Sequence, residues 1–297
     1  MNNVLPRNSS AIWQGTLLAV LAAAMWSIIG PLSRSCFAVG VQPGEIAFWR
    51  LAMGGACFLL HALIRGECRT NLHDGCCFVV FAILGVATFF LSLQIAIQRS
   101  GAALAIILMD TAPIWVAIFS RILFGEKIGR KQTIAILLAM VGTSLVCMSG
   151  GSLGGPTSVL GLACGLISGF TYGLQFPFFV WWKNRYSTAM LFAGIFLPAA
   201  AVLFPFTEFL PNKSCEIWGI LCIQGILTSY GAYFVYGLSL RLISPVRAAI
   251  IGNLEPVFAT FLAWFFWNEM FLPIGWIGCG LVLFAVILLT LRAIKHR

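Results

Sequence analysis

The chain has 297 residues, of which 60% are hydrophobic and only 9% are charged. A soluble domain carries about a quarter charged residues, so this composition excludes a soluble globular protein and indicates lipid as the solvent. The net charge of +9 does not indicate a nucleic-acid partner, because no basic face with interleaved aromatic residues lies outside the apolar runs.

Apolar runs long enough to cross a bilayer follow one another along the whole sequence. Only helices and closed barrels satisfy their backbone in lipid, and the alternating ten-residue segments of a barrel are absent. The predicted fold class is therefore an all-α polytopic membrane protein without a separate soluble domain. We expect ten transmembrane helices of roughly twenty residues each, at about residues 12–33, 44–64, 74–97, 102–124, 131–149, 156–181, 187–206, 216–240, 246–267 and 271–291.

The first two spans hold two candidate site residues, Trp26 and Arg50. The first span contains an A-x-A pattern at residues 22–24, but its apolar run continues to Ile29, so we interpret it as a retained helix and not as a signal peptide. Trp26 is a candidate cavity residue. Arg50 lies about 9 Å along the second span. It either anchors this helix, by reaching outward or through an internal ion pair, or binds a carboxylate or phosphate of a substrate.

The fourth and ninth spans each place an acid near a proline in an otherwise apolar segment. IILMDTAPIW (106–115) holds Asp110 and Pro113, and IIGNLEPVFA (250–259) holds Glu255 and Pro256. An ionised group at this depth costs on the order of 3 kcal/mol, so each acid should face a cavity or a partner. We expect one or both acids to contact an amine-bearing substrate or a coupling proton. A neutral acid hydrogen-bonded between helices is the alternative.

The two prolines predict kinks in these helices. Pro113 removes a backbone donor and frees the carbonyl of Met109, and Pro256 does the same to Gly252. Freed carbonyls are tolerated in a membrane only where they meet protein or a wet cavity. A kinked helix beside an acid is therefore a plausible wall of a binding site, and a purely structural kink is an equally open interpretation.

Aromatic and small residues mark the sixth and eighth spans. Tyr230, Tyr233 and Tyr236 recur every third residue and stay within about 120° of arc on one helix. Together with Tyr172 they could offer rings and hydroxyls to an organic solute, and packing against a neighbouring helix is equally open. Gly161, Gly165 and Gly169 predict close packing against another helix.

The second half of the sequence repeats the first. At an offset of 143 residues Pro113 falls on Pro256 and Asp110 on Asn253, and at an offset of 146 Trp26 falls on Tyr172. A repeat of five spans is odd in number, so the second copy must enter the membrane from the opposite side. This predicts an inverted repeat, with five-helix units at 1–150 and 151–297 around a site near the midplane.

The repeated motifs resemble a known family. The P-x(12)-E spacing in PIWVAIFSRILFGE (113–126) and PVFATFLAWFFWNE (256–269), the AAAMWSIIGP stretch of the first span and Arg50 resemble the EamA-type branch of the drug/metabolite transporter superfamily. The resemblance covers essentially the whole chain. It implies a fold of ten helices in a 5+5 arrangement with both termini cytoplasmic. It also implies transport, often outward, of amino acids, nucleotide-related metabolites or other small organic solutes.

Basic residues are divided unequally between the two sides of the predicted membrane. With the N-terminus inside, only Arg34, Arg99 and Lys213 fall outside, which is a positive-inside bias that places both termini in the cytoplasm. The cytoplasmic set comprises Arg7, Arg65, Arg69, Arg121, Lys127, Arg130, Lys131, Lys183, Arg185, Arg241, Arg247, Arg292, Lys295 and Arg297.

These features together predict a secondary transporter of a small organic metabolite in a bacterial inner (plasma) membrane. We favour an amino-acid-like solute, export over import, and alternating access as the mechanism. An uncoupled facilitator or channel and a non-transporting membrane receptor are the alternatives. The candidate residues for substrate binding or coupling are Asp110, Glu255, Trp26, Tyr172, Tyr230, Tyr233, Asn253 and Arg50, and the predicted helix kinks are at Pro113 and Pro256.

An enzyme is not expected, because none of His61, His73 and His296 lies in a metal or nucleophile motif such as H-E-x-x-H. We expect no cofactor, no metal and no nucleic acid. The expected partners are the small-molecule substrate and membrane lipid, and the expected assembly is a monomer or homodimer.

Overall fold

The computed structural model describes residues 9–126, 128–149, 158–267 and 272–295, without the side chains of 9, 263–267 and 290–295. Within these ranges the regular structure is helical and no strand occurs. The helices are α1 Ser9–Trp26, α2 Ile29–Ala38, α3 Pro43–Ile64, α4 Leu72–Phe81, α5 Thr88–Ser100, α6 Ala102–Met109, α7 Ala112–Phe124, α8 Arg130–Ser149, α9 Val159–Trp182, α10 Thr188–Leu203, α11 Cys215–Cys222, α12 Ala232–Leu242, α13 Pro245–Gly252, α14 Glu255–Trp267 and α15 Pro273–Lys295. Two π-helices, η1 Ala82–Ala87 and η4 Ile223–Gly231, join α4 to α5 and α11 to α12, and a short 3₁₀ turn Phe204–Phe206 follows α10.

Eight helical segments are long and apolar enough to cross a membrane, and they agree with the first eight predicted spans. The ninth predicted span is the pair α13 and α14, and the tenth is α15, of which the part with described side chains, Pro273–Leu289, is apolar. The prediction of an all-α membrane protein is confirmed at this level. The eight spans are Ser10–Ala38, Pro43–Ile64, Leu72–Ser100, Ala102–Phe124, Arg130–Ser149, Val159–Trp182, Thr188–Phe206 and Cys215–Leu242.

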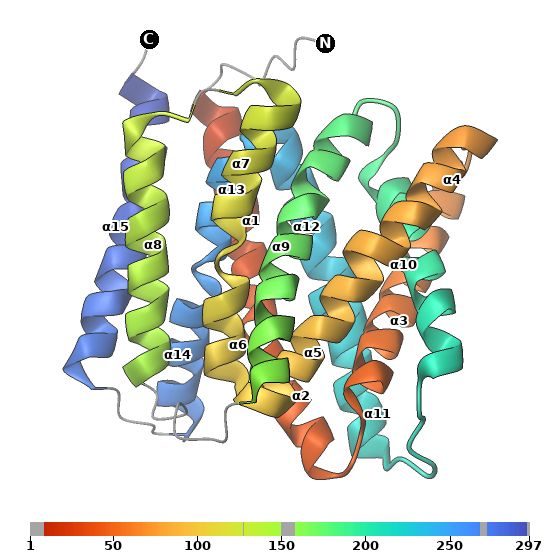
Figure 1. Cartoon of the computed structure of the whole chain (residues 1–297). Helices are drawn as coiled ribbons and strands as arrows, with labels where there is room; N and C mark the ends of the chain where they lie inside the picture. Colours follow the sequence, from red (N-terminus) through yellow and green to blue (C-terminus); the bar gives the residue numbers. More distant parts are fainter. Residues whose placement is uncertain (1–8, 127, 150–157, 268–271, 296–297) are drawn as a thin grey trace.

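The helices run roughly side by side, with α1 beginning and α15 ending at the same end of the bundle (Figure 1). We call this the terminal end, and it also holds the turn between α9 and α10. The opposite end holds the turn between α2 and α3 and the segment before α11 (Figure 1). Helix α8 packs along α15, α3 along α10, α5 along α9, and α1 along α12.

Three spans are interrupted near their middle. Helix α1 stops at Trp26 and α2 begins at Ile29, α6 stops at Met109 and α7 begins at Ala112, and α13 stops at Gly252 and α14 begins at Glu255. The last two interruptions lie at mid-height in the bundle (Figure 1). Lipid offers no hydrogen bonds to the backbone freed at such places, so interruptions occur where protein or a cavity surrounds them.

The two prolines of the predicted kinks lie just after these interruptions. Pro113 is the second residue of α7 and Pro256 the second residue of α14. We expected each proline inside a bent but continuous helix, and instead it begins a new one. The first turn of a helix has no intrahelical acceptor for its N–H groups, so a proline there loses no hydrogen bond.

Glycines allow α9 to pack directly on the interrupted fourth span. A Cβ atom on Gly169 would lie 2.5 Å from Oγ1 of Thr111 and 2.7 Å from the carbonyl oxygen of Leu108. Gly165 faces Leu108 in the same way, and Gly173 extends the stripe by one turn, with 2.6 Å between its ideal Cβ and that of Trp115. The predicted close packing of this glycine stripe is confirmed, and it fixes the backbone on one side of the break.

Candidate functional site

A small cavity with largely buried lining residues lies at the level of the interruptions. Trp26, Met109 and Glu255, three of its lining residues, are the last residue of α1, the last of α6 and the first of α14. The cavity offers about 20 Å³ to the centre of a water molecule, which is room for roughly one water. Its full lining is Trp26, Ile29, Arg50, Phe89, Leu93, Met109, Tyr172, Tyr233 and Glu255.

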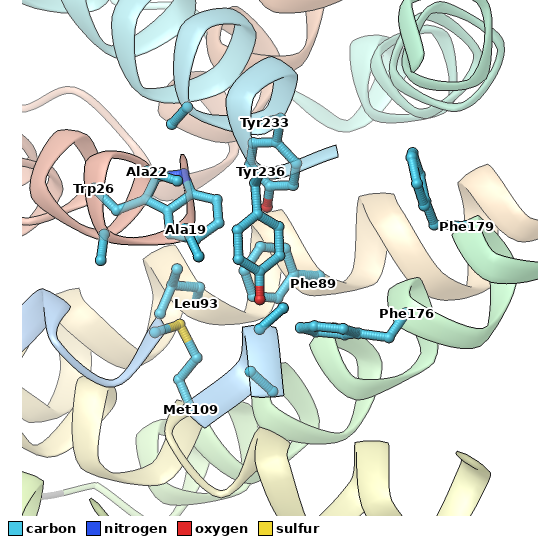
Figure 2. Packing of buried hydrophobic residues seen from close by; sticks show 14 of the residues in the cluster. Ala19, Ala22, Trp26, Phe89, Leu93, Met109, Phe176, Phe179, Tyr233 and Tyr236 are labelled. Carbon is cyan, nitrogen blue, oxygen red and sulfur yellow. The ribbon is translucent and has the colours of Figure 1, made fainter. Parts of the chain in front are cut away.

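Aromatic rings form one wall of the cavity. Trp26 meets Tyr233 and Tyr236 edge-on at centroid distances of 5.2 Å and 4.9 Å, and Tyr172 at 6.2 Å. Its indole N–H donates to the carbonyl oxygen of Thr228 in η4 at 3.0 Å, which fixes the ring. Figure 2 shows these rings of α1 and α12 gathered beside Phe89 of α5. Such edge-to-face clusters hold their rings rigidly and leave ring faces and hydroxyls for a solute.

Arg50 contributes a buried guanidinium to the same cavity. Only 1% of the residue is exposed, so its side chain does not reach outward to an interface. Its Nε donates to Oγ of Ser229 at 3.4 Å, and its guanidinium carbon lies 4.7 Å from the centroid of the Phe90 ring. Among the described residues Nη1 has no hydrogen-bond partner and no carboxylate lies within 4.0 Å of the guanidinium.

The position of Arg50 depends on a glycine one helical turn away. A Cβ atom on Gly54 would lie 2.9 Å from the Cβ of Ser229, so only glycine lets α3 approach η4 this closely. Removing a charge from water costs several kcal/mol unless it is paired and hydrogen-bonded. An unpaired guanidinium in a cavity is therefore a strong site for an anionic group.

Glu255 places a carboxyl in the cavity at the first residue of α14. It is 8% exposed, and it interacts electrostatically with Arg50 without forming an ion pair within 4.0 Å. The N–H groups of a first helical turn point toward this end of the helix, which favours a negative charge there. The cavity therefore has a cationic group and an anionic group that do not satisfy each other.

The predicted site residues divide into two groups in the structure. Trp26, Arg50, Tyr172, Tyr233 and Glu255 line the cavity. Asp110, Asn253 and Tyr230 are not among its lining residues.

Asp110 and Asn253 occupy equivalent places, each directly after the helix that its break ends. They are 5% and 2% exposed. Tyr230 is half-buried elsewhere, and its hydroxyl shares a hydrogen bond of 2.9 Å with Nδ1 of His61.

Several cavity-lining positions carry no signal in the sequence. Phe89, Leu93 and Met109 line the cavity but are ordinary apolar residues of membrane helices. Thr228 and Ser229, which hold Trp26 and Arg50, are a polar pair inside an apolar span, and that pattern could have identified them.

Glu126, the first acid of the repeated P-x(12)-E motif, lies away from the cavity. It follows α7 at the terminal end, where burial raises the pKa of its carboxyl and nearby Lys183 counteracts the shift. Its repeat partner Glu269 lies outside the described residues. No group of three or more His, Cys, Asp or Glu side chains in the described part of the chain could hold a metal ion.

Comparison with known proteins identifies the family. The model of the EamA-like transporter family matches residues 13–148 and again residues 159–291. The chain belongs to the EamA-like transporter family. Its membership, together with the apolar helices, makes it an integral membrane protein with a transporter role.

Relatives and a solved structure agree with this assignment. The uncharacterized transporter YdfC of Bacillus subtilis is 23% identical over 255 residues, which cover 84% of this chain and 82% of YdfC. The uncharacterized inner membrane transporter YedA of Escherichia coli is 28% identical over 263 residues, which cover 85% of this chain and 84% of YedA. A crystal structure 19% identical to the chain has a TM-score of 0.80 and covers 95% of this chain and 98% of its own, so the fold is shared.

Proposed function

We propose that this EamA-like protein is a secondary transporter that exports a small, amino-acid-like solute by alternating access. The observation that carries the proposal is the small cavity at the helix interruptions, where Arg50 and Glu255 form no ion pair within 4.0 Å among the described residues. A guanidinium matches the carboxylate of such a solute, and a carboxylate matches its ammonium group. The aromatic wall of Trp26, Tyr172 and Tyr233 provides apolar contact for the rest of the molecule.

Alternating access needs two units that move about one site, and we assign these to residues 1–150 and 151–297. The family model matches once within each unit. Interruptions recur at Asp110 and Asn253, and π-helices recur at Ala82–Ala87 and Ile223–Gly231. A 5+5 inverted repeat of ten helices accounts for this pairing. Rocking of the units would then open the cavity to one side of the membrane and then to the other.

The proposed export is described relative to an orientation in the membrane. The excess of Lys and Arg around the predicted cytoplasmic loops supports a cytoplasmic terminal end. A cleft of about 270 Å³, bordered by Gln98, Arg99 and Glu208, opens at the opposite end. In this orientation the cleft faces outward and receives the solute that leaves the cavity.

Reconstitution into liposomes tests the proposal. We expect saturable counterflow of zwitterionic amino acids, and slower counterflow of the matching amine and of the matching acid. Glu255→Gln should reduce transport roughly 10- to 100-fold, the value of one lost charge-assisted hydrogen bond of about 1.5–3 kcal/mol. Its folded yield should change much less, because an amide retains the volume of the carboxyl.

Two outcomes would contradict the proposal. A Glu255→Gln variant that carries solute at the wild-type rate would remove Glu255 from the site. Wild-type protein that carries no amino acid, amine or acid in either direction would favour a non-transporting receptor.

A further inference from the structure

Asp110 is a buried acid that the cavity does not use. It is 5% exposed, follows the last residue of α6, and its backbone N–H donates to the carbonyl oxygen of Ile106 at 2.8 Å. Among the described residues its Oδ2 has no hydrogen-bond partner, and no basic side chain forms an ion pair with it within 4.0 Å. Buried polar groups in folded proteins are almost always satisfied, so an exception of this kind needs a physical explanation.

Helices α8, α14 and α9 contribute groups near Asp110. Helix α8 contributes Thr143, which approaches the carboxyl without a hydrogen bond of ordinary geometry, and Cys147. Helix α14 contributes Glu255, which interacts with Asp110 electrostatically. Helix α9 contributes Gly169, which faces the backbone of this break and adds no charge. The charged neighbour of Asp110 in this set is therefore another acid.

Two carboxyl groups in a medium of low dielectric constant resist ionising together. Glu255 has the attraction of Arg50 and lies in the first turn of α14, so it ionises more readily than Asp110. Asp110 has no basic partner within 4.0 Å among the described residues and directly follows the C-terminal end of α6. Asp110 is therefore the member of the pair that keeps a proton more firmly.

We propose that Asp110 is the proton-binding residue of the transport cycle, separate from the solute site and coupled to it through Glu255. This inference rests on the proposed function. When the ammonium group of a solute pairs with Glu255, the repulsion that keeps Asp110 protonated is removed. Asp110 then releases its proton to the side to which the cavity is open. When the solute leaves on the other side, Asp110 takes up a proton there, so one solute exchanges for one proton.

The surroundings of Asp110 fit a proton better than a metal cation. A hard cation needs several oxygen ligands, and in the described structure Thr143 is the side-chain oxygen that approaches this carboxyl. The position equivalent to Asp110 in the second half is Asn253, buried to the same degree, with its Nδ2 atom lacking a partner among described residues. An amide does not titrate, so this coupling group is present in one half of the molecule and absent from the equivalent break.

The same equivalence provides the test variant. Asp110→Asn places in the first break the residue that the second break already accommodates, so the fold should tolerate it. Purified wild-type and variant proteins are reconstituted in liposomes. Two quantities are measured for the amino acid that shows the fastest counterflow: counterflow itself, and uptake driven by an imposed pH gradient with a pH-sensitive dye following the proton.

We expect Asp110→Asn to keep counterflow within about threefold of wild type and to lose gradient-driven uptake and dye response by at least about tenfold. Asp110→Glu should recover part of the proton coupling, because it restores the carboxyl. Asp74→Asn removes a carboxyl from the terminal end, where Tyr186 and Arg185 contact it. This control variant should keep the ratio of driven uptake to counterflow at the wild-type value.

Three results would overturn the inference. Asp110→Asn could keep gradient-driven uptake, the wild type could respond to a sodium gradient and not to a pH gradient, or counterflow could fall as far as driven uptake in a well-folded variant. Different experimental results would contradict the inference and the proposed function. Wild-type counterflow without any proton dependence contradicts only the role of Asp110, whereas no solute flux at all contradicts transport itself.

Discussion

Each end of the bundle has a cluster in which a buried carboxylate is paired, around Asp74 and around Glu45, whereas Arg50 and Asp110 at the centre form no ion pair among the described residues. At the terminal end, Asp74 at the start of α4 accepts a hydrogen bond of 2.6 Å from the hydroxyl of Tyr186. It also accepts one of 3.2 Å from the side chain of Asn71 and lies 3.5 Å from Nη1 of Arg185. These contacts tie the start of α4 to the turn between α9 and α10.

The opposite end has a comparable cluster around Glu45 of α3. Nζ of Lys213 lies 2.6 Å from Oε1 of Glu45, and both side chains are almost fully buried. The backbone N–H of Leu210 donates to Oε2 at 2.8 Å, and the indole N–H of Trp49 donates to Oε1 at 3.2 Å. Both carboxylate oxygens of Glu45 are therefore satisfied by residues of this chain.

The centre has buried charge without this satisfaction. Nη1 of Arg50 and Oδ2 of Asp110 lack hydrogen-bond partners among the described residues, although both residues are buried, with exposed fractions of 1% and 5%. Groups that only stabilise a fold are expected to be paired within it. The difference supports a structural role for the two end clusters, and it supports the proposal that the central groups are available to a solute and a proton.

Lys213→Met gives the largest expected effect on stability. It leaves the buried Glu45 carboxylate without its cation, and breaking a buried ion pair in this way costs roughly 3–5 kcal/mol. The free energy of unfolding in detergent should fall by this amount, and the transport rate per folded molecule should stay at the wild-type value. The double variant Glu45→Gln/Lys213→Met leaves no buried charge and should recover most of the loss. A Lys213→Met variant that unfolds like wild type would remove the structural role of this end cluster.

Gly169→Ala should have an intermediate effect on stability. It tests how tightly α9 packs against the break between α6 and α7. The added methyl would contact Oγ1 of Thr111 and the carbonyl oxygen of Leu108. Overpacking of this kind costs about 1–3 kcal/mol and would displace α9 or the break itself. Both the unfolding free energy and transport should therefore decrease. Gly219→Ala is the matched control, because a Cβ atom there meets nothing within 4 Å. Equal stability of the two variants would contradict the tight fit.

The sequence was sufficient for the eight spans that the structure supports and for the resemblance to the EamA family, because both follow from long apolar runs and repeated motifs. The lining residues Trp26, Arg50, Tyr172, Tyr233 and Glu255 were candidates for a related reason. Each is polar or aromatic in an apolar helix, and such a residue needs a partner or a cavity. Whether these residues bind a solute is still a prediction.

The orientation of the remaining candidates could not be read from periodicity. The π-helix η4 changes the rotation per residue just before Tyr233, so the spacing of the tyrosines did not show that Tyr230 turns toward His61. The interruption after Met109 likewise ends the helical phase that would have placed Asp110 relative to the cavity. A pattern at a fixed angle per residue fails wherever the helix itself is irregular.

Ser229→Ala should give the smallest effect. It tests how much the hydrogen bond from Arg50 to Ser229 contributes to positioning the guanidinium. Oγ of Ser229 is the side-chain oxygen that accepts from Arg50, at 3.4 Å. Loss of one such hydrogen bond is worth about 0.5–1.5 kcal/mol, which is roughly a 2- to 10-fold reduction in the apparent affinity for an amino acid.

The maximal rate and the unfolding temperature of Ser229→Ala should change little, because Arg50 keeps its contact with Phe90. Thr207→Ser is a matched control in which a hydroxyl remains but lies at the opposite end, bonded to Leu203. If Ser229→Ala lowered stability as much as Lys213→Met and left affinity unchanged, Arg50 would be a structural group like those at the ends. The contrast between centre and ends would then no longer separate solute binding from folding.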